Sequence, residues 1–519
     1  MGKDYADLTG MTHQNGNTSP DGHLFSPASI DGSEHGENDK RQAIGRVASP
    51  MRSESTSVRC YFWVPRGTLV EKTQLVRTES KVAGGEPISF FGVVEEVYRR
   101  SRRRSFDEEF DNFDGEIDYE PPFKAEGVTY AEVSILRSEP PILTPPLEES
   151  LVFLSTEADA GATYGYDTMI EHAEDGSEVA NWGLPVGLLR NGGTATVGVA
   201  RIDLRDLVGD RAGHLNVTGQ AGRGTKSSFL LVVVRALINF ARQWDDGTPG
   251  RQPFSVRPIV FNVKGNDLMY IDAPNRHLTG QQRQTWAEMG IEPEPFQRAE
   301  FYAPCRPTHG AINRAEPRML RPRDFESQTK PYYWTLTDVI RFGLWTYLYS
   351  EDARNSDTLM AMVDHVLDVL AEDCPPDREH PAGLQLRAPS PDSSGIPQSF
   401  QALRIWLRDA LANQHHPARD HGIHAHGTCR ALLSRLGLVL DQDGRAIFDD
   451  GVGTGRPLLV TDGNRSTAPA VARNSSAPRE IEPNRGDPLV VDIATLPPDL
   501  RRFVVAAVLD QVKANQMGP

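Results

Sequence analysis

The sequence predicts an α/β fold that begins with an all-β barrel and contains a helical insertion. Between residues 44 and 183, short apolar stretches alternate with Gly, Pro and charged turns at strand-like spacing, as in a small barrel or sandwich. A glycine-rich turn then joins an expected strand to a long apolar helix. Beyond Trp334 the apolar residues recur at helical spacing, which predicts a helical subdomain.

Length and composition limit the class of protein. A chain of 519 residues has room for about three or four domains. Its net charge of −16 repels nucleic acid, so any DNA contact must be local, as in a pore or groove. Four dispersed cysteines support neither a disulfide framework nor a cysteine zinc site. The longest apolar runs are too short for a membrane helix and the N-terminus lacks an apolar signal, so we expect a cytoplasmic protein without a membrane partner.

The N-terminal half is expected to hold a tail and the barrel. Residues 1–43 are rich in Gly, Ser, Asn, Asp and His, which predicts a disordered tail. Residues 44–183 form the expected barrel, with strands near residues 60–64, 88–94, 128–136 and 151–154. A basic run inside it precedes an acidic run. The basic run could be a patch for nucleic-acid binding or nuclear targeting, or it could be the solvent-exposed end of a strand beside an acidic loop. It contains Arg99, Arg100, Arg102, Arg103 and Arg104.

Three further regions follow. Residues 184–334 are the first part of the α/β core, with expected strands at 214–218, 258–263 and 267–272 and a helix at 227–243. Residues 335–440 form the helical subdomain, in which three apolar faces mark three helices. Residues 441–519 comprise a polar loop and the return of the chain to the core, with a strand at 488–493 and a helix at 498–515.

The strongest chemical signal is a phosphate-binding turn between the expected strand at 214–218 and the helix. It comprises Gly219, Gln220, Ala221, Gly222, Arg223, Gly224, Thr225, Lys226, Ser227 and Ser228. Glycines let consecutive N–H groups face a phosphate, and the start of a helix adds its dipole. Lys226 is suited to the β- and γ-phosphates of ATP, and the hydroxyl of Ser227, or less readily that of Ser228, to Mg²⁺.

The spacing of this turn differs from that of the usual P-loop. The common pattern is G-x-x-x-x-G-K-[S/T], whereas here Thr225 separates Gly224 from Lys226. The alternative is an ordinary glycine-rich connection between a strand and a helix. The order of glycines, lysine and two serines at a helix start favours the phosphate-binding interpretation.

Three segments, 184–193, 213–231 and 258–272, resemble the HerA/FtsK-like ATPases, specifically bacterial HerA-like proteins whose P-loop ends in G-T-K-S-S. Segments 44–47 and 90–104 resemble the barrel that precedes the motor in that family, and 486–496 resembles a late strand of its RecA-like core. The resemblance implies a hexameric ATP-driven helicase or translocase, a hydrolase that moves double-stranded DNA through a pore, often beside a nuclease partner.

A P-loop ATPase also needs a carboxylate at the end of a neighbouring apolar strand, usually Asp followed by Glu. The candidates are Asp272, Asp462, Asp492 and Asp510, and none of them precedes a glutamate. Asp510 lies in a helical pattern, so Asp492 joins Lys226 as a catalytic candidate. In the resembling family, the acidic strand follows segments like 488–493 and 499–513, so we expect this chain to stop short of it.

That expectation leaves the activity open. The remainder of the motor could lie on a second polypeptide, the reading frame could be cut, or the subunit could bind nucleotide without turning it over. The protein is then an ATPase only if an acid completes the site. The alternative function is a catalytically idle ATP-binding scaffold, or a fragment of a split motor, that recruits a nuclease or other effector.

Three weaker signals each have a structural alternative. Five histidines and Cys429 within residues 415–429 suggest either a zinc site or a polar connection between helices. Lys264 could contact phosphate or DNA, or serve as a turn lysine before Gly265. Four arginines could each reach the γ-phosphate of a neighbouring subunit, or could each be an ordinary surface arginine. They are Arg404, Arg408, Arg430 and Arg435.

Overall fold

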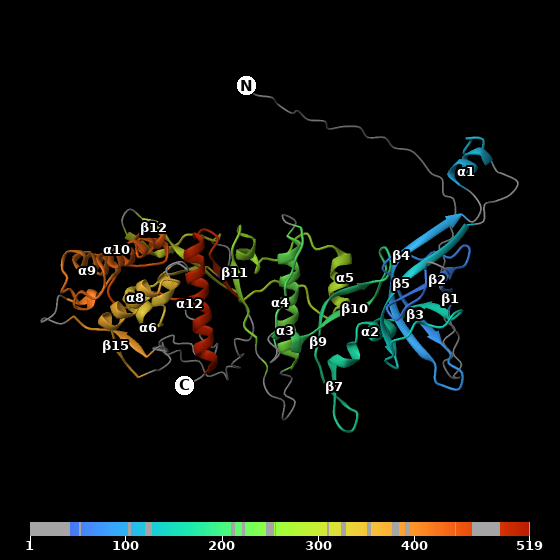
Figure 1. The fold of residues 1–519 in the computed structure, drawn as a ribbon, viewed down its shortest axis with the longest axis horizontal. Helices are drawn as coiled ribbons and strands as arrows, with labels where there is room; N and C mark the ends of the chain where they lie inside the picture. The colour runs from blue at the N-terminus through green and yellow to red at the C-terminus, as the bar shows by residue number, and fades with distance from the viewer. Residues whose placement is uncertain are drawn as a thin grey trace, which may run out of the picture.

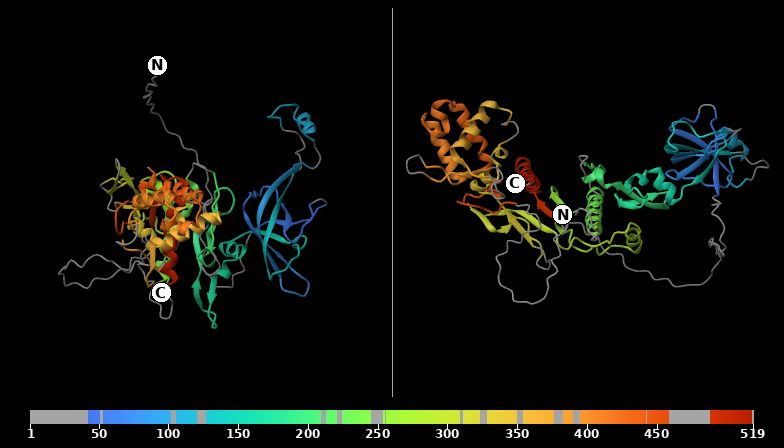
Figure 2. Two further views of the ribbon diagram at one scale, coloured as in Figure 1. Left: turned by 60° about the vertical axis from the view of Figure 1, so that its left-hand side comes forward. Right: turned by 90° about the horizontal axis from the view of Figure 1, so that it is seen from below.

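The structure is a computed structural model that places the barrel and the helical region at opposite ends of an elongated arrangement (Figures 1 and 2). It describes residues 42–50, 53–101, 105–119, 127–208, 213–220, 224–244, 254, 256–308, 311–322, 328–349, 354–375, 383–389, 395–441, 443–458 and 488–517. Of the predicted disordered tail, residues 1–41 lie outside the described residues, and Ala43 already belongs to the first strand. Both the mixed α/β class and the N-terminal all-β barrel are confirmed.

Six antiparallel strands close the N-terminal barrel in the order β1-β2-β5-β4-β3-β6. Side chains such as Phe62, Val94 and Val133 fill its interior, because alternate residues of each strand point inward. The closed ring excludes the sandwich alternative. The strands are β1 (Ala43–Val47), β2 (Arg59–Val64), β3 (Leu75–Ser80), β4 (Ile88–Ser101), β5 (Gly127–Glu139) and β6 (Leu151–Leu154).

Strands β4 and β5 extend well past the expected limits and form a two-stranded arm. Their pairing continues from Val97 opposite Ala131 to Ser101 opposite Gly127. Most of these residues of β4 are exposed. The apolar pattern from which the strand was predicted therefore stops at Val94, whereas the pairing with β5 continues beyond it. The arm carries α1 (Phe106–Asn112) at its tip (Figure 1).

Short elements join the barrel to the core and contact its strands. Arg77 of β3 forms an ion pair with Asp159 (3.1 Å), and the Leu75 N–H donates to Asn191 Oδ1 (2.9 Å). The Gly193 N–H donates to the Glu71 carboxylate. The joining elements are α2 (Glu157–Thr163), η1 (Tyr166–Met169), β7 (Ile170–His172), β8 (Glu178–Asn181), β9 (Gly183–Arg190), β10 (Thr196–Asp203) and α3 (Leu204–Val208).

The core is a sheet whose central strands are parallel. Strand β17 (Leu489–Asp492) lies between β11 (Ile259–Asn262) and β12 (Glu300–Thr308), and β14 (Thr329–Tyr332) pairs with the far side of β12. Strand β13 (Ala311–Pro317) adds an antiparallel hairpin to β12. The expected strands at 258–263 and 488–493 are therefore present.

Helices cover both faces of this sheet. On one face, Ile238 of α4 (Thr225–Trp244) packs with Val490 and Phe301. On the other, Phe503 and Val504 of α12 (Pro498–Met517) pack with Val491. Because successive strand residues alternate between faces, even-numbered residues of β11 and β17 point toward α4 and odd-numbered ones toward α12.

The prediction of strands at 214–218 and 267–272 is wrong. Residues 213–220 form no strand, because Leu215 packs on the α4 cluster without joining a ladder. Segment 267–272 instead begins as the 3₁₀ helix η2 (Asp267–Tyr270). Gly265 turns the chain with a φ of +67°, so Met269 and Ile271 reach the α4 face of the sheet from a turn. Helix α5 (Gly280–Glu288) follows.

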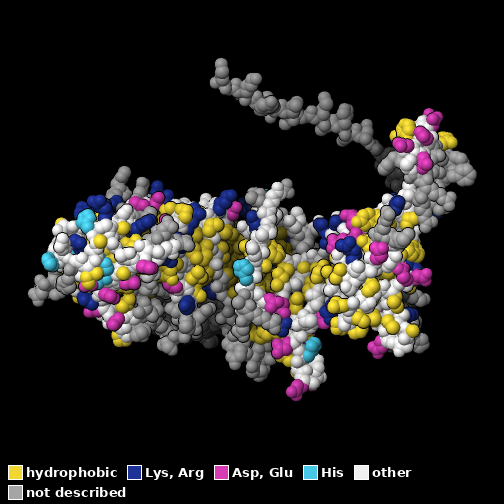
Figure 3. Space-filling model, viewed as in Figure 1, with side chains coloured by type: hydrophobic (Ala, Val, Ile, Leu, Met, Phe, Trp, Pro, Cys, Tyr) yellow, Lys and Arg dark blue, Asp and Glu magenta, His cyan; other side chains and the backbone are white. Residues whose placement is uncertain are grey.

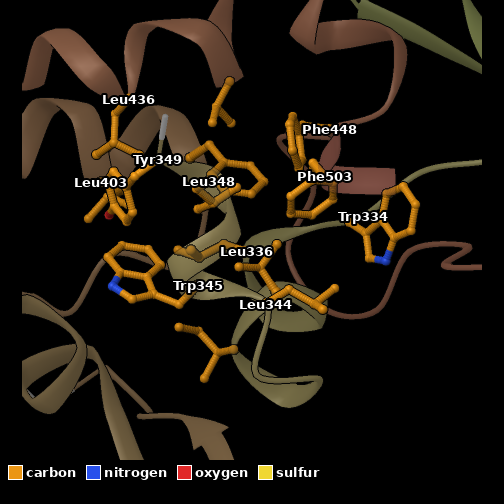
Figure 4. Close-up of a cluster of buried hydrophobic side chains, with 14 of the residues drawn as sticks. Trp334, Leu336, Leu344, Trp345, Leu348, Tyr349, Leu403, Leu436, Phe448 and Phe503 are labelled. Carbon is orange, nitrogen blue, oxygen red and sulfur yellow. The ribbon is translucent and has the colours of Figure 1, made fainter. Parts of the chain in front are cut away.

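The helical region surrounds the largest buried cluster, part of which appears in Figure 4. Phe503 of α12 lies between Trp334 and Phe448, with ring centroids 5.2 and 4.8 Å away. The apolar face expected over 336–348 is interrupted by Gly343, whose φ is +66°. The elements are α6 (Leu336–Arg341), η3 (Trp345–Leu348), α8 (Asp357–Leu370), β15 (Ala371–Asp373), β16 (Leu384–Leu386), α9 (Phe400–Ala412), η4 (Pro417–Gly422), α10 (His426–Arg435), α11 (Gly437–Leu440) and η5 (Gly444–Ala446).

Candidate functional site

Lys226 lies in the first turn of α4 with its side chain directed back along the preceding loop. Its Nζ donates a hydrogen bond to the carbonyl oxygen of Gly219, 3.2 Å away. A side chain at Gly219 would meet the Lys226 stem at 3.3 Å. Glycine at this position therefore lets the ammonium group lie over the start of the glycine-rich turn.

The start of α4 holds backbone donors that find no acceptor within the part of the chain that the structure describes. The first intrahelical bond runs from the Ser228 N–H to the Gly224 carbonyl (2.9 Å). Thr225, Lys226 and Ser227 precede it, and their N–H groups have no acceptor among the described residues. Three aligned donors at a helix start, beside an ammonium group, form an anion-binding arrangement.

The rest of the turn is placed only in part. Gly224 has a φ of +66°, a conformation that favours glycine, and Thr225 is the first residue of α4. Gln220, Ser227 and Ser228 are exposed. The remaining predicted contacts, Ala221, Gly222 and Arg223, lie outside the described residues.

Asp492 ends strand β17 and is almost fully buried, with 3% of its surface exposed. Its Oδ1 accepts hydrogen bonds from Asn262 Nδ2 (2.8 Å) and from the Ala494 N–H (3.2 Å). Tyr332 donates to its main-chain carbonyl oxygen (2.9 Å). Asn262 is its register partner on β11, so the two side chains lie on the same face of the sheet.

That face is the one that α4 covers. Asn262 and Asp492 share the parity of Val260 and Val490, which pack with Ile238 of α4. Both residues stand at the carboxyl ends of parallel strands, where open α/β sheets bind their ligands. Sequence reasoning selected Asp492 but missed Asn262. The available signal was a polar residue at the end of the apolar run of β11.

The other acidic candidates have different surroundings. Asp272 forms a buried ion pair with Arg321. Asp510 lies on α12, as its helical spacing predicts, and accepts a hydrogen bond from Tyr347 (3.3 Å). Asp462 lies outside the described residues.

The weaker signals do not join this site. Among the described residues, no three His, Cys, Asp or Glu side chains come together to hold a metal ion. In the histidine-rich segment, His416 Nδ1 accepts from the Ala418 N–H (3.2 Å) and caps η4, and His424 lies against the ring of His365. Lys264 is exposed two residues after the end of β11. The four candidate arginines lie on α9 and α10, with Arg404 half-buried and the other three, Arg408, Arg430 and Arg435, exposed.

Burial raises the pKa of the Asp492 carboxyl above its ordinary value of 3.8, although hydrogen bonds from Ala494 and Asn262 oppose the shift. The folded chain therefore holds this proton more tightly than the unfolded chain, so the stability from this group is present below pH 3.8 and is lost as the pH rises through the folded pKa.

The substitution Asp492→Asn removes this titration. We therefore expect the free energy of unfolding of the variant to increase relative to that of the natural chain as the pH rises from 3.8 through the folded pKa. At higher pH the difference between the two proteins should stay constant. Urea unfolding of both proteins across a pH series measures the difference, and one that does not change with pH would contradict the raised pKa.

No protein-family model matches the chain, and no curated protein matches its sequence. Within the part of the chain that the structure describes, every helix is too short or too polar to cross a membrane.

Proposed function

We propose that this chain binds ATP and Mg²⁺ through residues 219–228, with a RecA-like core, as a subunit of a HerA-like DNA translocase or helicase. The observation that carries the proposal is the geometry of Lys226, whose ammonium group lies over Gly219 in the helix turn where three N–H groups have no acceptor among the described residues. An ammonium group and aligned N–H groups are the donors that a polyphosphate requires. Asp492 at the carboxyl edge of the sheet, on the face that α4 covers, supports the same site.

The donor set fits a magnesium nucleotide. Mg²⁺ keeps several of its waters and binds phosphate oxygens with one or two protein oxygens, so it does not need a cluster of three acids. Ser227 would supply the hydroxyl, and the carboxylate of Asp492 would bind a water of the ion. When bound, the ion neutralises charge on the phosphates.

DNA binding by an acidic chain requires its positive groups to be concentrated. Figure 3 shows Lys and Arg side chains gathered along one edge of the molecule, over α9, α10 and β12. Several copies of the chain, closed into the hexameric ring that the resemblance implies, would line their basic edges on one duplex. The four cysteines, all free, suit work in the reducing cytoplasm.

A second function, an idle nucleotide-binding scaffold that recruits a nuclease or other effector, is favoured by one observation. Asp492 is followed by Ile493, whose side chain is buried in the cluster around α12, so no second acid stands beside it. The tip of the β4–β5 arm offers exposed apolar residues for an effector, with Phe110 67% and Ile117 96% exposed.

Equilibrium binding to the full chain tests the proposal. We expect a fluorescent ATP analogue to bind in the presence of Mg²⁺, unlabelled ATP to displace it, and nucleotide to promote assembly on long duplex DNA, measured by sedimentation velocity. Binding of nucleotide without DNA would favour the scaffold. Absence of nucleotide binding would overturn both functions.

A further inference from the structure

Asn262 makes an unusual pair of contacts at the end of β11. Its side chain is completely buried, and Nδ2 donates to Asp492 Oδ1 and to the Gly265 carbonyl oxygen, both at 2.8 Å. These two acceptors fix the orientation of the amide, because the opposite orientation would point its oxygen at a carboxylate and a carbonyl. The remaining oxygen, Oδ1, therefore points away from Asp492 and Gly265.

Two oxygens at this position have no donor. Asn262 Oδ1 is buried and has no hydrogen-bond partner among the described residues. Both side-chain hydrogen bonds of Asp492 end on Oδ1, and within the described residues none reaches Oδ2. A buried carbonyl oxygen without a donor is costly, so its retention here calls for a donor that arrives with a ligand.

The surroundings indicate the nature of that ligand. Asn262 and Asp492 stand at the carboxyl edge of the sheet on the α4 face, and the first turn of α4 holds Lys226 and the N–H groups that have no acceptor among the described residues. An amide oxygen and a carboxylate oxygen are the acceptors that the water molecules of hydrated Mg²⁺ seek. A phosphate by itself would be repelled by both oxygens, so the cation and its waters are the part of the ligand that fits.

We propose that Asn262 is a positioning residue for the magnesium ion of the bound nucleotide. Its Nδ2 holds the Asp492 carboxylate in place, and its Oδ1 accepts a hydrogen bond from a water molecule of the ion. The inference rests on the proposed nucleotide site and adds to it a residue that the P-loop pattern does not contain.

The test compares nucleotide binding with and without Mg²⁺. The Asn262→Leu variant has a side chain of similar size without polar atoms. In this variant we expect the Mg²⁺-dependent gain in ATP affinity to fall about tenfold, because one hydrogen bond to a charged group is lost. Affinity for ATP in EDTA should stay the same. Isothermal titration with ATP and with ATP plus Mg²⁺ measures both quantities, without any need for hydrolysis.

Tyr332→Phe is the matched control, because it removes a different buried hydrogen bond to Asp492, the one to its main-chain carbonyl. We expect this variant to keep its Mg²⁺ dependence. Equal losses in the two variants would assign Asn262 a structural role and overturn the inference, as would an unchanged Mg²⁺ dependence in Asn262→Leu.

A second variant covers poor folding of the first. Asn262→Ser is smaller and polar, and its short hydroxyl cannot take the place of both amide atoms, so it should show the same loss of Mg²⁺ dependence. If the natural chain binds ATP with Mg²⁺ and Asn262→Ser binds it equally well, the inference fails while the nucleotide site stands. If the natural chain binds no nucleotide, the proposed function fails and the inference with it.

Discussion

Replacing Lys226 with Ala is expected to weaken the binding of ATP with Mg²⁺ by about 100-fold or more. The ammonium group would contact the β- and γ-phosphates, and hydrogen bonds to charged groups contribute about 1.5–3 kcal/mol each. Two such bonds amount to about 3–6 kcal/mol, and each 1.4 kcal/mol is about tenfold in affinity. Lys226 is the only cation among the described residues of the turn, so no neighbour there can replace it.

Lys72→Ala is the control for a general effect of lost charge. Lys72 forms an exposed ion pair with Glu96 (3.3 Å) on the barrel, and exposed pairs of this kind contribute little to stability. We expect this variant to bind ATP as the natural chain does. Titration with a fluorescent ATP analogue measures all three proteins, and equal affinity in Lys226→Ala would refute the phosphate-binding assignment.

The second large effect concerns turnover, since the purified chain should bind ATP but hydrolyse it slowly or not at all. Phosphoryl transfer depends almost entirely on the positioning of metal, water and phosphate. Asp492 ends the central strand β17 at the carboxyl edge of the sheet, on the face that α4 covers, and the residue after it is Ile493 rather than a second acid. An arginine supplied by a neighbouring subunit contributes about 10³ to 10⁵ in rate, and a lone subunit lacks that contribution too.

Steady-state ATPase measurements with and without long duplex DNA test this expectation. Asp492→Asn serves as the comparison, because it keeps the shape of the side chain and removes its charge. Rapid hydrolysis that DNA stimulates and that Asp492→Asn abolishes would show that Asp492 already serves as the catalytic acid. Rapid hydrolysis that survives the substitution would place that acid elsewhere in the chain.

Local patterns predicted the parts of the fold that depend on neighbours in sequence. Helix α4 and strand β17 occur where apolar spacing and flanking glycine or proline place them. The arm was not predictable from periodicity, because the outer residues of β4 pair with β5 without burying an apolar face. Segment 267–272 has strand-like composition, yet the turn at Gly265 directs it across the sheet as η2.

The same distinction applies to the candidate site. Lys226 and Asp492 were found because each belongs to a local pattern, a glycine-rich turn or the end of an apolar strand. Asn262 was not, because its importance arises from a contact with a residue 230 positions away. Only the parallel register of β11 and β17 brings the two side chains together.

The position of β17 between β11 and β12 also has a consequence for synthesis on the ribosome. About 180 residues separate the end of β12 from the start of β17, so at about 5–20 residues per second the nascent chain waits roughly 10–40 s for its central strand. During that interval β11 and β12 each lack the neighbour that later pairs with them, and unpaired apolar edges invite association between chains. We therefore expect co-translational chaperones to matter most for this protein after β12 has emerged and before β17 has.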